Sequence, residues 1–276
     1  MLSLSFSCVT SNFVRRLISA LVLVPLVLAA VWAGGFVYDA FIVTVILIGF
    51  SEWVKLTNPK VRRRVRLMGF AGLAAVLFSF KALGGDFAFI LSLVIWLAIL
   101  LAAARKCGPD KEAHLSRALW LSFGIPYLAW SGLSLIFLRT DALGGLQTMI
   151  YLLFVVWGTD TGAYFAGRTI GGPKLWPQIS PKKTWAGLFG GMALAAIIGY
   201  LAVCLVGREA FWFPPALAVI LAVVSQAGDF FESFVKRRNH VKDSGTLIPG
   251  HGGVLDRADG LFFAAIFMLL FYMTGM

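Results

Sequence analysis

The chain has 276 residues, of which 59% are hydrophobic and only 13% are charged, and its mean hydropathy is +0.86. This composition excludes a soluble globular domain and is typical of a polytopic membrane protein. The net charge of +11 would suit a nucleic-acid partner, but the basic residues follow the membrane topology, so we expect none. The cysteines Cys8, Cys107 and Cys204 have neither disulfide-framework nor metal-site spacing.

Apolar stretches long enough to cross roughly 30 Å of hydrocarbon recur along the whole chain. They cover residues 17–33, 38–53, 67–83, 87–104, 118–138, 149–165, 185–205, 211–227 and 258–276. Because lipid offers no partner to backbone polar groups, the sequence predicts an all-α integral membrane protein with about nine transmembrane helices. Arg15 and Arg16 precede the first stretch as in a signal peptide, but the stretch is too long for one, and we expect a retained helix.

The basic residues alternate between the two ends of the predicted helices. All but three of the 24 Lys and Arg residues fall on the N-terminal tail and the even-numbered connections, the exceptions being Lys81, Arg139 and Arg208. The positive-inside rule therefore places the N-terminus in the cytoplasm and predicts a multi-pass protein of the inner (cytoplasmic) cell membrane. The basic run at residues 61–66 fits this topology and would also attract anionic lipid headgroups.

Polar chemistry is concentrated in the second half of the chain. We expect about five N-terminal transmembrane helices over residues 1–145 and a catalytic transmembrane region over residues 146–276. The catalytic region contains the sixth and eighth connections, predicted as cytoplasmic loops at residues 166–184 and 228–259. By the charge count both loops face the cytoplasm, as a single composite active site would require.

The sixth connection ends in a cluster of phosphate-binding side chains. Lys182 and Lys183 offer ammonium groups, and Ser180 and Thr184 offer hydroxyl groups, which together are typical of a phosphate clamp. The segment is not a Walker A loop, because Pro173 stands where such a loop needs lysine. Interfacial anchoring of the following helix is the simpler alternative for the two lysines.

Carboxylates are candidate metal ligands near the ends of the helices. Asp256 and Asp259 are three residues apart, so they share one helix face at the start of the last span, and Asp229 and Glu232 repeat that spacing. Hard oxygen ligands of this kind suit Mg²⁺. The alternative is a set of solvated residues at helix starts. Asp160 lies near the membrane boundary, where a charge is costly, and is a further candidate.

A glycine-rich turn, residues 249–253, precedes the last span with the sequence PGHGG. Glycines such as Gly252 and Gly253 let the backbone approach a ligand closely and direct successive N–H groups toward an anion. His251 lies between them, but no second histidine has zinc-like spacing to it, and a structural role is the alternative to a direct one.

The eighth connection resembles the signature of phosphatidate cytidylyltransferases (CDP-diacylglycerol synthases), which reads Ser-x-x-Lys-Arg, Lys-Asp, Pro-Gly-His-Gly-Gly and Asp-Arg-x-Asp. The matching residues are Ser233, Lys236, Arg237, Lys242, Asp243, 249–253, Asp256, Arg257 and Asp259. Residues 160–168 and 180–187 also fit the family, in order and distance. The chain departs from the pattern at Ala186, where relatives often have a polar residue, and at Gly260, where serine is common.

This resemblance implies that CTP and phosphatidate from the inner leaflet react to give CDP-diacylglycerol and pyrophosphate in phospholipid biosynthesis. It implies a Mg²⁺ cofactor, with a second cation such as K⁺ in a dinuclear site, and it leaves a homodimer open. The metal ligands it implies are Asp229, Asp256 and Asp259, and the catalytic set adds Lys242 and Asp243. The substrate-binding residues it implies are Asp160, Ser180, Lys182, Lys183, Thr184, Lys236, Arg237, His251, Gly252, Gly253 and Arg257.

Two other functions compete with cytidylyl transfer. A CTP-dependent lipid kinase of the polyprenol type shares the glycine and aspartate motif, but would release CDP and would need a base for its alcohol substrate. An ion or solute transporter would use the aspartates as coupling sites, usually near the bilayer midplane and between repeats. The sequence has no clear repeat, and its acidic residues lie at the ends of the predicted helices.

Overall fold

The computed structural model describes residues 3–105, 111–140, 142, 144–206, 215–250 and 252–274. Over these residues the chain forms nine helices and one two-stranded sheet. The helices are α1 (Ser3–Ala33), α2 (Gly35–Thr57), α3 (Arg63–Leu83), α4 (Gly85–Ala104), α5 (Lys111–Thr140), α6 (Gly145–Thr169), α7 (Trp185–Val206), α8 (Pro215–Arg238) and α9 (Leu255–Met273). Seven of them are long and apolar enough to cross a membrane, which confirms the predicted class of helical membrane protein.

The chain divides into two compact units. The first contains Met1–Pro126 and Val241–Arg257, and the second contains Tyr127–His240 and Ala258–Met276. The division falls inside α5 and inside α9, so each of these helices contributes to both units. The functional boundary near residue 145 stays a prediction.

In the first unit, α2 is fixed by aromatic packing near its C-terminal end. The side chain of Trp53 is fully buried, and its indole N–H donates a hydrogen bond to the carbonyl oxygen of Trp120 at 2.9 Å. Phe50 meets the ring of Phe70 edge-on, with centroids 5.1 Å apart. These contacts fix the turn of α2 that contains Glu52, which is only 4% exposed.

In the second unit, α6 and α7 pack closely along a row of glycines. A Cβ at Gly162 would lie 2.5 Å from the carbonyl oxygen of Gly190, and a Cβ at Gly191 would lie 2.9 Å from that of Thr159. Small residues of this kind allow helix backbones to approach each other in a membrane. Because the two helices are connected through residues 170–184, their packing also sets the position of that segment.

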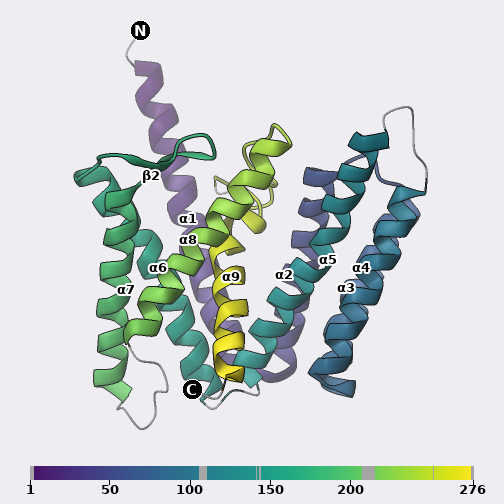
Figure 1. Cartoon of the computed structure of the whole chain (residues 1–276). Coiled ribbons are helices and arrows are strands. Elements are labelled where there is room, and N and C mark those ends of the chain that lie inside the picture. Colours follow the sequence, from purple (N-terminus) through teal and green to yellow (C-terminus); the bar gives the residue numbers. More distant parts are fainter. Residues whose placement is uncertain are drawn as a thin grey trace. The chain divides into compact units, whose positions relative to one another are not determined.

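The connection between α6 and α7 is a short hairpin, which the sequence analysis did not predict. Strand β1 (Lys174–Trp176) pairs antiparallel with β2 (Ser180–Thr184), which is labelled in Figure 1. Lys174 lies opposite Thr184, and Trp176 lies opposite Ser180. The hairpin therefore presents the two predicted phosphate-binding lysines on a strand.

Helix α8 extends beyond the predicted span at residues 211–227. It continues to Arg238, so Asp229 and Glu232 lie inside the helix rather than at its end. Three basic residues in its last turn favour this extension, because cations stabilise the negative end of the helix dipole. Residues 211–214 lie outside the described residues.

The glycine row predicts a stability defect when α6 and α7 are forced apart. Gly162→Ala places a methyl group against backbone, which cannot move aside, so we expect a loss of roughly 1–3 kcal/mol. Thermal unfolding of the detergent-solubilised protein should show a melting temperature lower by several degrees. Gly85→Ala is the matched control, because a Cβ there meets nothing closer than 3.7 Å. Equal melting temperatures for the two variants would contradict the packing.

Candidate functional site

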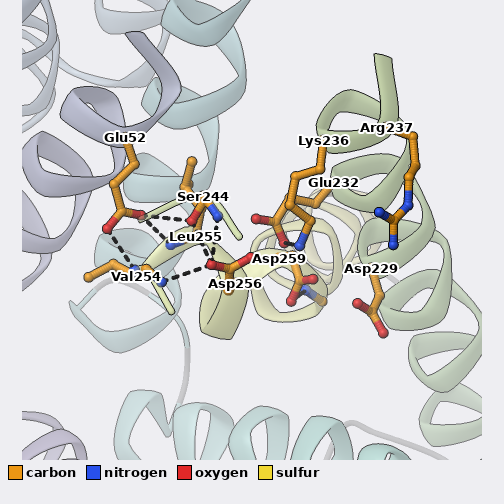
Figure 2. A network of polar contacts seen from close by, with 12 residues as sticks. Glu52, Asp229, Glu232, Lys236, Arg237, Ser244, Val254, Leu255, Asp256 and Asp259 are labelled. Carbon is orange, nitrogen blue, oxygen red and sulfur yellow. Dashed lines mark hydrogen bonds and ion pairs between the residues drawn. The ribbon is translucent and has the colours of Figure 1, made fainter. Parts of the chain in front are cut away.

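In the first unit, a buried carboxylate accepts hydrogen bonds from the segment that precedes α9. Oε1 of Glu52 accepts one from the N–H of Val254 at 3.0 Å, and Oε2 accepts one from the N–H of Leu255 at 2.9 Å (Figure 2). The hydroxyl of Ser244 lies 3.2 Å from the same Oε2. Hydrogen bonds to an ionised acceptor are the strong ones, and they offset the cost of burying Glu52.

Asp256, in the first turn of α9, is held by the same segment. Its Oδ2 accepts hydrogen bonds from the N–H of Ser244 at 2.8 Å and from the N–H of Gly253 at 2.8 Å. The hydroxyl of Ser244 lies 2.9 Å from this oxygen, so its single proton serves either Asp256 or Glu52 at one time. The start of a helix also favours negative charge. The side chain of Asp256 is thus fixed by several donors.

The glycines of the PGHGG turn fit closely around these two carboxylates. Gly252 has a φ of +87°, and a Cβ there would lie 2.5 Å from Oδ2 of Asp256. A Cβ at Gly253 would lie 2.5 Å from Oε2 of Glu52. The N–H of Gly253 donates to the side chain of Asp256, whereas the N–H of Gly252 donates to the carbonyl oxygen of Ile248. The predicted contact of these glycines with a bound anion stays a prediction. His251 lies outside the described residues.

In the second unit, three carboxylates gather where α8 faces the first turns of α9. Glu232 is 2% exposed and Asp259 is 9% exposed, and the carboxylates of Asp229 and Glu232 lie close enough to Asp259 for their charges to repel its own. A Cβ at Gly228 would lie 2.5 Å from the carbonyl oxygen of Asp259, so glycine permits this close approach of the helices. Negatively charged side chains that are buried close together repel one another strongly and require compensating cations.

Two lysines supply part of that compensation. Lys236 lies 3.4 Å from Glu232 one helical turn earlier on α8. Lys183, on strand β2, forms an ion pair with Asp229, and its ammonium group lies 4.4 Å from the ring centroid of Phe230. The hairpin thus brings a cation of the sixth connection against a carboxylate of α8.

The other hairpin residues have distinct environments. The backbone N–H of Gly187 donates a hydrogen bond to Oγ1 of Thr184 at 3.1 Å, so this threonine caps α7 and keeps its own proton for donation. Ser180 is half-buried, whereas Lys182 is exposed. Nε of Arg237 lies 3.4 Å from the carbonyl oxygen of Ile179, which connects the last turn of α8 to the hairpin.

The remaining predicted residues lie at the surface of their own units. In the first unit Lys242, Asp243 and Arg257 are exposed, and in the second Asp160 is exposed on α6. Their predicted substrate or catalytic roles stay predictions. Glu52 was not predicted as a functional residue, although the sequence contains one signal for it. It is an acidic residue at the end of an otherwise apolar stretch, where a charge is costly unless it has partners.

The carboxylates of α8 and α9 suit a hard divalent cation. No group of three His, Cys, Asp or Glu side chains within the described part of the chain converges closely enough to be a metal site by itself. Mg²⁺ does not need such a cage, because it binds through one or two carboxylates together with water and substrate phosphates. The contact between Asp229 and Asp259 provides such a pair of oxygen donors.

Comparison with known proteins assigns the family. The sequence model of the Cytidylyltransferase family matches residues 14–274. The phosphatidate cytidylyltransferase of Brucella suis biovar 1 is 42% identical over 261 residues, covering 95% of this chain and 93% of the relative. That of Pseudomonas aeruginosa is 35% identical over 268 residues, covering 95% and 97%. That of Staphylococcus haemolyticus is 31% identical over 252 residues, covering 90% and 94%. The chain therefore belongs to the cytidylyltransferase family.

Proposed function

We propose that this chain is a phosphatidate cytidylyltransferase, which converts CTP and phosphatidate to CDP-diacylglycerol and pyrophosphate for phospholipid biosynthesis. The ion pair between Lys183 and Asp229 is the observation that carries this proposal. It joins strand β2 to a carboxylate of α8 within one unit, although Lys183 and Asp229 are 46 positions apart in the sequence. A reaction between a nucleotide and a lipid phosphate needs both cations and metal-binding carboxylates at one place.

The proposed setting is the cytoplasmic face of the inner membrane, with nine transmembrane helices and the N-terminus in the cytoplasm. The distribution of Lys and Arg supports this orientation, because all but three of the 24 fall on one side in the nine-helix arrangement. Phosphatidate would then enter from the inner leaflet, and CTP from the cytoplasm. The hydrophobic helices supply the lipid contact, and a homodimer is compatible with this setting.

Asp229, Asp256 and Asp259 are the proposed Mg²⁺ ligands, with a second cation such as K⁺ in the same centre. When bound, Mg²⁺ would neutralise phosphate charge and favour in-line displacement at the α-phosphorus of CTP. Asp256 and Asp259 lie one turn apart on α9, and Asp259 contacts Asp229 of α8. Their oxygen donors and the burial of Asp259 support this assignment.

The proposed chemistry needs little acid–base catalysis. A phosphate oxygen of phosphatidate forms a bond to the α-phosphorus of CTP, while the bond from that phosphorus to the bridging oxygen breaks and pyrophosphate leaves. The attacking oxygen is already an anion, so no residue has to remove a proton from it. The chain's cations reduce repulsion between the two substrates, and Lys236, Arg237, Lys242 and Arg257 are the proposed phosphate contacts outside the hairpin.

The test of the function uses purified, detergent-solubilised protein with Mg²⁺, phosphatidate and CTP labelled at the α-phosphate. We expect label in the lipid phase, equimolar pyrophosphate in the aqueous phase, and loss of both with EDTA. Release of CDP with a lipid alcohol as substrate, and no lipid label from phosphatidate, would instead identify a lipid kinase. Inertness with both lipids would contradict the proposed function and favour a transporter.

The carboxylate cluster predicts a specific loss of turnover. Asp229→Asn removes one charge from the proposed metal centre while keeping the side-chain size, so we expect turnover to fall by about 100-fold or more. The labelled-CTP assay at saturating Mg²⁺ measures this. Asp86→Asn, in the exposed first turn of α4, is the control and should retain activity. Turnover of Asp229→Asn equal to that of the control would exclude the ligand role.

The two hairpin lysines should differ in effect. Lys183→Met leaves Asp229 without its ion-pair partner, so we expect a large fall in turnover and a melting temperature lower by about 3–6 °C. Lys182→Met removes an exposed cation, so we expect an unchanged melting temperature and mainly a raised KM for CTP. Kinetics and thermal unfolding of the two variants measure the contrast. The same stability and the same turnover for both would contradict the ion pair.

A further inference from the structure

We propose that Glu52 is the positioning residue for Asp256, acting through the segment from Ser244 to Leu255. This inference rests on the proposed function, because Asp256 is a proposed metal ligand, but its geometry lies entirely within the first unit. Glu52 comes from α2, far from the family motifs in the sequence, and the resemblance assigns it no role.

The carboxylate of Glu52 binds two consecutive backbone amides at the start of α9. The N–H groups of Val254 and Leu255 are among those that a helix cannot pair internally at its N-terminus. One buried side chain of α2 therefore caps α9, with an oxygen for each amide. Because both bonds fix backbone, they restrict the direction in which the next residue, Asp256, leaves the helix.

A second set of bonds connects the two carboxylates to each other. The hydroxyl of Ser244 lies 3.2 Å from Glu52 and 2.9 Å from Asp256, and the N–H groups on both sides of the turn donate to Asp256. A proton donated to one carboxylate is withdrawn from the other. Whether Ser244 donates its hydroxyl hydrogen bond to Glu52 therefore decides whether that bond is available to Oδ2 of Asp256.

Packing leaves no alternative place for the Glu52 side chain. A Cβ at Gly245 would lie 2.7 Å from its Oε1, and a Cβ at Gly253 would lie 2.5 Å from its Oε2. Backbone thus surrounds the carboxylate closely on two sides. Trp53, the next residue, is fully buried and hydrogen-bonded to Trp120, so α2 cannot easily turn to withdraw it. A buried charge that only filled space would be more costly than an apolar side chain, whereas this one orders a loop.

The experiment compares Glu52→Gln with the wild-type full-length protein in detergent. Glutamine keeps the shape and one acceptor oxygen, but it places an NH₂ donor against a backbone N–H donor. We expect hydrogen exchange of the peptide covering residues 244–257 to rise about 10-fold or more, with little change in α4. We expect turnover to fall about 10–100-fold and half-saturating Mg²⁺ to rise, while KM for CTP changes little.

Asp39→Asn is the matched control, since Asp39 is a carboxylate of the same helix that pairs with Lys81 instead. It should leave both the exchange of residues 244–257 and turnover at wild-type values. Unchanged exchange in Glu52→Gln, or a rise spread equally over α2, α3 and α4, would overturn the positioning role. The role would also be overturned if turnover fell without a rise in the exchange of residues 244–257 and saturating Mg²⁺ did not restore it.

A second variant keeps the test decisive if Glu52→Gln does not fold. Ser244→Ala removes only the shared hydroxyl, and we expect a rise in half-saturating Mg²⁺ of about 3–10-fold with retained melting temperature. An unchanged half-saturating Mg²⁺ concentration in Ser244→Ala would overturn the proposed link between Glu52 and Asp256 through this hydroxyl. A failure of the proposed function would show in the wild type itself, whereas a failure of the Glu52 role would show only in the variants.

Discussion

The cost of placing carboxylates inside an apolar helical protein is the constraint on which the candidate site depends. A buried carboxylate is tolerated only with hydrogen-bond donors, cations or a metal nearby. This chain buries Glu52, Glu232 and Asp259 to at least nine-tenths, although only 13% of its residues are charged. The two units stabilise their buried carboxylates with different groups, and these groups differ in how freely they can move.

In the first unit the compensation comes mainly from backbone amides. Glu52 accepts two of them and Asp256 accepts two more, so both carboxylates are held in fixed orientations. In the second unit it comes mainly from lysines, with Lys183 against Asp229 and Lys236 against Glu232, while Oδ1 of Asp259 accepts a hydrogen bond from the N–H of Gly260 at 2.8 Å. Amides fixed in a turn give a rigid carboxylate, whereas lysine side chains can move toward an incoming phosphate. Fixed ligands and movable cations are both suited to the transfer of a charged group.

The sequence was sufficient to predict the helices and the family, because both depend on local patterns. Apolar length predicted the described helix ends to within four residues, except the start of α1, the start of α5 and the end of α8, where polar residues continue the helix beyond the apolar stretch. The β1–β2 hairpin and the role of Glu52 could not be predicted. Both depend on pairing between segments that are distant or irregular, such as Glu52 with Val254, and no periodicity marks such contacts.

The most direct test of the account is metal binding itself, measured by electron paramagnetic resonance with Mn²⁺ in place of Mg²⁺. Purified wild-type protein should bind Mn²⁺, and Asp259→Asn should bind it at least about 10-fold more weakly. Circular dichroism should be the same for both proteins. Equal Mn²⁺ affinity in the wild type and in Asp259→Asn would contradict the claim that the carboxylates of α8 and α9 form the metal centre.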